Sequence, residues 1–163
     1  MDTYLAIASK RDVREYSDAP IPDEVRERIL DAGRLTGSSK NRQRWEFVVV
    51  SGRARERLAD AVYAPENVRS AGLVVAIVGE AGSFDTGRCA QNMMLAAWGE
   101  GVVSCPNGVR DADAAAEICG GEVRAILSLG YPARPRDAAS RSAEEWSARA
   151  NRKPLSELVR EVS

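Results

Sequence analysis

The stretch "GSSKNRQRWEFVVV", residues 37–50, sets a run of polar side chains directly before an apolar run. The apolar part, rich in β-branched residues, is typical of a buried strand. Gly and Ser favour loops, which accounts for the first positions. Loop chemistry does not account for Asn41, Gln43 and Trp45, which arrive together where the strand begins. The stretch therefore predicts a loop before a buried strand, and its amide side chains require a further explanation.

On both sides of this stretch, short apolar runs alternate with segments of helical character. Buried strands are predicted over 46–51, 72–79, 102–105 and 123–131. Helices are predicted within 19–37, 52–63, 84–101 and 111–120, and a further helix at the N-terminus. Asp85 is the expected N-cap of the helix at 84–101. This alternation predicts one domain over residues 1–163 with an α+β fold in three layers, α/β/α. The pattern alone does not decide whether the strands are parallel.

The bulk composition is that of an ordinary globular protein, with 44% hydrophobic and 29% charged residues. A net charge of −1 gives no indication of a nucleic-acid partner. No apolar run reaches the roughly 20 residues needed to cross a bilayer. The start "MDTYLAIASK" lacks the basic region of a signal peptide, so we expect a cytoplasmic protein without a membrane partner.

The sequence holds no histidine and three cysteines, Cys89, Cys105 and Cys119. Without histidine, Ser-His-Asp and Cys-His catalysis and His-ligated metal sites are excluded in their usual forms. The cysteines form no CxxC pair, so we expect small buried side chains and no metal site. An enzyme of this composition would use a carboxylate, a Lys or Arg side chain, a thiol or a cofactor.

Four polar clusters interrupt the apolar scaffold, at 9–16, 37–45, 104–108 and 151–155. Each has an ordinary explanation when taken alone: a helix terminus, a loop, a tight bend and a charged tail. Neither GxxxxGK[ST] nor GxGxxG after a strand is present, so the sequence carries no standard nucleotide-binding motif.

Taken in order, the clusters resemble the FMN-dependent nitroreductase family. The loop keeps the family spacing of Ser, Asn, Gln and Trp before a strand, and this is the most specific part of the resemblance. The other matching positions are Lys10, Arg11, Arg14 and Tyr16; Asp85, Gly87, Gln91, Asn92 and the Leu95-Ala96-Ala97 run; Gly130-Tyr131-Pro132; and the Arg152-Lys153-Pro154-Leu155 run. The likeness spans residues 4 to 158.

The resemblance implies a nitroreductase-like fold, in which helices flank a central, mostly antiparallel sheet. Members are intertwined homodimers with FMN at the interface. The resemblance therefore implies a homodimer in which the C-terminal segment, about 135–163, packs on the partner subunit. The apolar helix at 84–101 and a tail without core-forming residues agree with this expectation.

The resemblance also implies a bound FMN, with the chemistry carried by the flavin and no catalytic side chain. Lys10 and Arg11, with Arg152 or Lys153, would surround the phosphate. Arg14 would stabilise negative charge on the N1–O2 edge of the reduced ring. The implied cofactor-binding residues are Lys10, Arg11, Asp12, Arg14, Ser38, Ser39, Asn41, Gln43, Pro106, Asn107, Gly108, Arg152 and Lys153.

By this resemblance the chain would move a hydride from NADH or NADPH, through flavin N5, to a nitroaromatic, quinone or similar acceptor. Three alternatives stay open: a flavin-binding or flavin-storing protein without turnover, a reductive dehalogenase or flavin-fragmenting enzyme of the same fold, and an unrelated α/β domain. Asp12 stands where the family has Ser, and Gly37 and Arg44 replace two prolines. The segment after Trp45 is short. These departures favour an open active site or weak retention of FMN.

Overall fold

The computed structural model describes residues 1–162 and divides into two compact units. The larger unit is Arg11–Arg136, and the smaller combines Met1–Lys10 with the C-terminal segment from Asp137. The prediction of a single domain stays a prediction.

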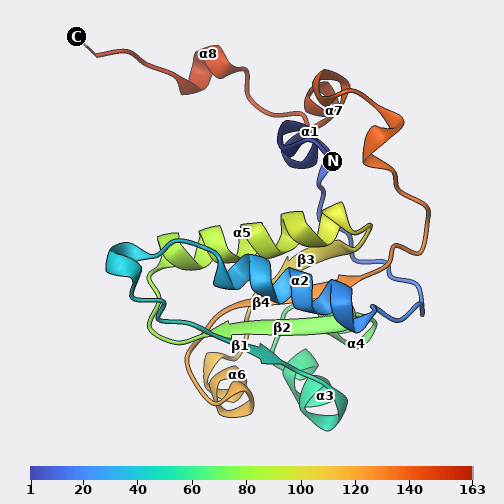
Figure 1. Cartoon of the computed structure of the whole chain (residues 1–163). Coiled ribbons are helices and arrows are strands. Elements are labelled where there is room, and N and C mark those ends of the chain that lie inside the picture. Colours follow the sequence, from blue (N-terminus) through green and yellow to red (C-terminus); the bar gives the residue numbers. More distant parts are fainter. Residues whose placement is uncertain (163) are drawn as a thin grey trace. The chain divides into compact units, whose positions relative to one another are not determined.

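The larger unit alternates helices and strands along the chain, as predicted (Figure 1). Its strands are β1 (Glu46–Val49), β2 (Leu73–Val78), β3 (Val103–Asn107) and β4 (Val123–Gly130). Its helices are α2 (Asp23–Arg34), the short 3₁₀ turn η1 (Ser39–Asn41), α3 (Gly52–Asp60), α4 (Pro65–Arg69), α5 (Ser83–Gly99) and α6 (Ala112–Cys119).

The strands form a four-stranded sheet in the order β1-β2-β4-β3, and every neighbouring pair is antiparallel. Val75 of β2 lies opposite Val49 of β1 and Leu127 of β4, which fixes the register at the centre. All six residues of β2 are buried, because this central strand is covered on both faces. The predicted mostly antiparallel sheet is therefore confirmed.

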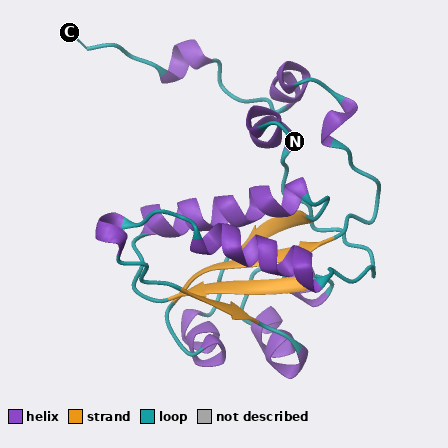
Figure 2. Ribbon diagram, in the orientation of Figure 1, coloured by secondary structure: helices purple, strands orange, loops and turns teal. Residues whose placement is uncertain are grey.

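Helices cover both faces of the sheet, so the predicted three layers are confirmed (Figure 2). On one face α2 and α5 pack over alternate strand residues, with Ile29 and Met93 fully buried among them. On the other face α3, α4 and α6 cover the remaining strand residues, with Leu58 and Ile126 fully buried. The alternation of strand side chains between two cores is what a period of two produces.

Two boundaries differ from the prediction. Strand β3 was expected to end at residue 105 but continues through Pro106 and Asn107, which pair with β4. Proline is tolerated there because β3 is an edge strand. Asp85 was expected to cap the helix at 84–101, and this is wrong: Gly82 is the N-cap, and Asp85 lies inside the first turn of α5.

The smaller unit contains α1 (Thr3–Ser9), the 3₁₀ turn η2 (Ala138–Ser140), α7 (Ala143–Arg149) and α8 (Leu155–Leu158). A capping box of Ser142 and Glu145 starts α7. Trp146 donates from Nε1 to the Ala138 carbonyl at 2.8 Å, and Arg141 lies 4.9 Å from its ring centroid. Within residues 1–162, no helix has the length and apolar character that a membrane span requires.

Candidate functional site

The loop 37–45 folds as a compact turn that is held by its own hydrogen bonds. The Asn41 N–H donates to the Ser38 carbonyl at 2.9 Å. The Gln43 N–H donates to the hydroxyl oxygen of Ser38, also at 2.9 Å. The Gln43 side-chain amide in turn donates to Asn41 Oδ1 at 3.2 Å. The two amides that the sequence pattern selected therefore lie side by side, and Ser38 organises the backbone between them.

The backbone of this loop is strained. Lys40, Asn41 and Gln43 have φ angles of 53°, 52° and 48°, in the left-handed region that side chains other than glycine rarely occupy. This conformation costs roughly 1–2 kcal/mol at Lys40 and at Gln43, whereas asparagine tolerates it better. Strain of this kind is concentrated at functional sites, where it holds polar groups in one geometry. The loop conformation is therefore consistent with a binding role.

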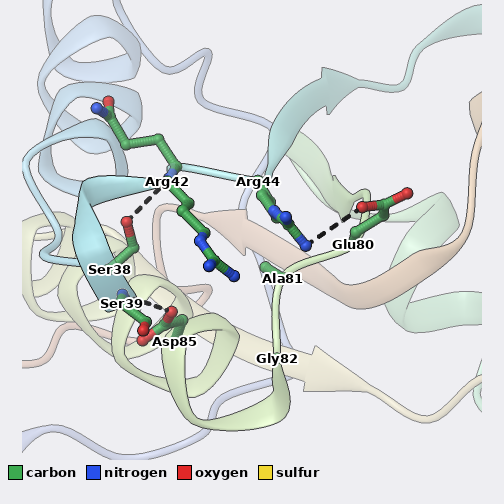
Figure 3. A pocket seen from close by; sticks show the side chains of 9 residues that line it. Ser38, Ser39, Arg42, Arg44, Glu80, Ala81, Gly82 and Asp85 are labelled. Carbon is green, nitrogen blue, oxygen red and sulfur yellow. Dashed lines mark hydrogen bonds and ion pairs between the residues drawn. The ribbon is translucent and has the colours of Figure 1, made fainter.

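Contacts with neighbouring elements hold the loop in place (Figure 3). The Asp85 carboxylate accepts a hydrogen bond from the Ser39 N–H at 3.1 Å. Trp45 packs against the core under α2 and α5, as expected of an anchor. At Gly79 a Cβ would lie 2.8 Å from the Arg44 carbonyl, so only glycine allows this close approach.

A hollow of about 240 Å³ lies between this loop and the start of α5. Figure 3 shows Arg42 extending into it, with Ser39 and Asp85 on one side and Arg44 on the other. Arg44 forms an ion pair with Glu80 at 3.5 Å. Ligand pockets usually measure about 300–1,000 Å³, so this hollow could hold only part of a large ligand. Its lining is Ser38, Ser39, Arg42, Gln43, Arg44, Glu80, Ala81, Gly82 and Asp85.

The segment that follows Lys10 runs along the start of β3. Asp12 forms a parallel bridge with Ser104, and the Val13 N–H donates to the Ser104 carbonyl at 3.1 Å. Arg11 is half-buried. The Arg14 side chain is exposed and has no hydrogen bond or ion pair among the described residues. The fold therefore leaves the Arg14 guanidinium available to a ligand.

The segment Pro106–Gly108 ends β3. Its Asn107 side chain points into the protein, where Nδ2 donates to Ser128 Oγ at 2.9 Å and Oδ1 accepts from Asn67 Nδ2 at 2.5 Å. The Gly108 carbonyl accepts from the Tyr63 N–H at 3.0 Å. The Asn107 amide is thus committed to the protein interior, and only backbone groups of this segment can serve a ligand.

The remaining predicted cations belong to the smaller unit. Lys10 is the C-cap residue of α1, and its N–H donates to the Ala6 carbonyl at 3.0 Å. Arg152 and Lys153 are exposed in the connection from α7 to α8. Their grouping with Arg11 around a phosphate stays a prediction.

Several residues of the hollow were not predicted from the sequence, chiefly Arg42 and Glu80, and neither was the bond from Ser39 to Asp85. Arg42 and Arg44 alternate with the predicted amides Asn41 and Gln43. This alternation was the one sequence signal that could have indicated the arginines. Burial raises the pKa of the Cys89 thiol to about 11, with hydrogen bonding by Thr36 opposing the shift. Among residues 1–162, no cluster of three or more His, Cys, Asp or Glu side chains could hold a metal.

The family model described as the nitroreductase family matches residues 7–82 and 78–131, which is most of the chain. The chain belongs to the nitroreductase family. An Archaeoglobus fulgidus protein assigned as an NADH dehydrogenase/NAD(P)H nitroreductase is 31% identical over 149 residues, covering 80% of this chain and 86% of that protein. A Methanothermobacter thermautotrophicus protein with the same assignment is 38% identical over 53 residues. That match covers 32% of this chain and 28% of the relative.

A solved structure places the fold in the same family. The crystal structure of a nitroreductase-type protein from Desulfovibrio desulfuricans, in complex with FMN, superposes with a TM-score of 0.80. The two chains are 25% identical, and the match covers 100% of this chain and 98% of the other. The nitroreductase-like fold that the motif order implied is therefore confirmed.

Proposed function

We propose that this chain is an FMN-dependent oxidoreductase that uses NADH or NADPH to reduce a small acceptor, such as a nitroaromatic compound or a quinone. When bound, FMN would supply the redox chemistry by carrying the hydride at N5. The observation that carries the proposal is the strained loop at 38–43, where Ser38, Asn41 and Gln43 hold fixed polar groups within the family-matched region.

The residues of this loop fit a flavin by their chemistry. The edge of the ring offers carbonyl acceptors and an N–H donor, and carboxamides supply both complementary groups. Because Gln43 donates to Asn41, the Asn41 Nδ2 group and the Gln43 Oε1 atom stay available for a ligand. The loop would therefore bind and orient the ring edge, while Trp45 and Asp85 hold its backbone.

Two cationic regions would complete the binding. Arg14 would sit near the N1–O2 edge and favour negative charge there, with a charge-assisted hydrogen bond that contributes about 1.5–3 kcal/mol. Arg11, with Lys10, Arg152 or Lys153, would hold the phosphate through charge-assisted contacts. Proton transfer needs no histidine in this arrangement, in keeping with a sequence that has none.

The protein would act as a cytoplasmic homodimer, with the C-terminal segment on the partner. The C-terminal segment exposes Leu155, Leu158 and Val159, which supports packing of this segment on a second chain. The short segment after Trp45 would leave the site open, and Asp12 near the phosphate would weaken the retention of FMN.

The test is a turnover assay of the FMN-reconstituted protein with NADH or NADPH and a nitroaromatic or quinone acceptor. We expect acceptor-dependent oxidation of the nicotinamide. Arg14→Ala should lower kcat/KM by about 10-fold or more, from the hydrogen-bond contribution above. Arg26→Ala, which removes an exposed arginine of α2, is the matched control. A protein that binds FMN without turnover would instead be a flavin-binding protein, and the oxidoreductase proposal would be wrong.

A further inference from the structure

A chain of polar side chains crosses the face of the sheet covered by α3, α4 and α6. It runs from Tyr16, in the segment before α2, to Asn67 of α4, Asn107 of β3 and Ser128 of β4. Asn67 is only 4% exposed and Ser128 is fully buried. Polar groups in such positions are costly unless each finds a partner. We call these four residues the Tyr16 network.

The hydrogen bonds of the network all have a defined direction. The Tyr16 hydroxyl donates to Asn67 Oδ1 at 2.8 Å and lies 3.2 Å from the Ser128 carbonyl. Asn67 Nδ2 donates to Asn107 Oδ1, and Asn107 Nδ2 donates to Ser128 Oγ. Because each amide donates at one end and accepts at the other, the orientation of both is fixed.

The Tyr16 hydroxyl acts as a donor throughout the physiological range. Burial raises the pKa of Tyr16 above its usual value; electrostatic interactions with Cys105 and Asp12 add to this, and nearby Arg14 opposes it. A protonated phenol can always supply the hydrogen that Asn67 accepts. Apolar residues of similar shape would stabilise a core about as well as such a network. The network therefore contributes geometry more than stability.

The two ends of the network belong to segments with proposed roles in cofactor binding. Tyr16 lies two residues after Arg14, and Asn107 directly precedes Gly108. We infer that the Tyr16 network is a positioning device that fixes the Arg14 segment and the Gly108 backbone relative to each other. Asn107 then acts on the cofactor through the backbone that it anchors, without contacting it. The effect on FMN rests on the proposed function, whereas the mechanical coupling does not.

The experiment uses Tyr16→Phe, which removes one hydroxyl, and Ser128→Ala, which removes the Oγ atom that accepts from Asn107. Tyr131→Phe is the matched control, because it removes a hydroxyl from a half-buried tyrosine outside the network. The first measurement is amide hydrogen exchange at Asn107 and Gly108 in the protein without FMN. The second is the FMN dissociation constant and the flavin midpoint potential of the loaded protein.

We expect both network variants to speed exchange at Asn107 and Gly108, although neither substitution lies in that segment. The loss of one hydrogen bond should raise the FMN dissociation constant about 2- to 10-fold and shift the midpoint potential. The control should change neither. Gly108 is also held by Tyr63 and by the bridge from Val62 to Val109, so the variants should remain folded.

Unchanged exchange at Asn107 and Gly108 in both variants would overturn the inference, whether or not FMN binds. Faster exchange with an unaltered dissociation constant and midpoint potential would reduce the network to a structural role and would also overturn it. A wild-type protein that does not bind FMN would refute the proposed function, and the exchange data would still decide the coupling.

Discussion

The carboxylate of Asp85 accepts a hydrogen bond from the backbone N–H of Ser39 at 3.1 Å, across 46 positions of sequence. This bond ties the loop 37–45 to the first turn of the longest helix, α5. Further along α5 the helix packs into the core, where Met93 and Ala97 are fully buried. A negative charge in a first turn also complements the helix dipole. The loop is therefore held by an element that cannot easily move.

Asp85→Ala should loosen the loop and raise the FMN dissociation constant about 10-fold, because a hydrogen bond to a charged group is lost. Asp85→Asn keeps an acceptor and should have a smaller effect. Asp113→Ala removes an acidic residue from the first turn of α6 and serves as the control. Titration of each variant with FMN measures the effect. Equal affinities for Asp85→Ala and the control would contradict the anchoring role.

Substitutions at Lys40 test whether the loop backbone is strained, because Lys40 has a φ of 53°. Lys40→Val should lower the free energy of unfolding by about 1 kcal/mol, because β-branched residues tolerate the left-handed region poorly. Lys40→Gly removes the same charge and should not destabilise the protein. Urea denaturation of both variants separates backbone strain from charge. Similar losses in the two would show that strain is not the cause.

Gly79 has a φ of 120° and lies against the Arg44 carbonyl. Gly79→Ala should destabilise the protein by about 1–3 kcal/mol, because this conformation is nearly confined to glycine. Gly99→Ala, at the end of α5, should be neutral or stabilising, since a Cβ there would meet nothing within 4 Å. Thermal unfolding of the Gly79→Ala and Gly99→Ala variants measures the two effects. A tolerated alanine at position 79 would contradict the close approach that the structure shows.

Because the pKa of the Cys89 thiol is raised, we expect the protein to lose stability at alkaline pH. An unfolded thiol ionises near about pH 8.5, whereas burial holds the native pKa of Cys89 at about 11. Between these values the native state binds more protons than the unfolded state, so stability falls as pH rises. Cys89→Ala should flatten this slope in denaturation curves measured across that range. Val102→Ala, another buried truncation, should keep the wild-type slope.

Much of the fold could be predicted from the sequence because buried strands and amphipathic helices leave a local pattern. The fully buried β2, for example, is an uninterrupted apolar run. The end of β3 could not be predicted, because Pro106 and Asn107 have the local chemistry of a turn. Their strand geometry comes from pairing with Leu127 and Ile126, which lie far along the chain.

The loop amides of the candidate site could be predicted from the spacing of Asn41 and Gln43, which belongs to one continuous motif. The contacts that hold the loop in place could not be predicted. The bond from Asp85 to Ser39 and the bond from Tyr16 to Asn67 join residues 46 and 51 positions apart. Such partners are set by the fold, so the sequence pattern assigned Asp85 to helix capping and assigned no role to Asn67.

Anaerobic mixing of the FMN-loaded protein with NADH or NADPH shows whether a bound flavin accepts electrons from the nicotinamide. We expect the visible absorption band of the flavin to bleach within the turnover time and to return when a quinone or nitroaromatic acceptor is added. A flavin that stays oxidised with both nicotinamides, or a folded protein that does not bind added FMN, would contradict this expectation.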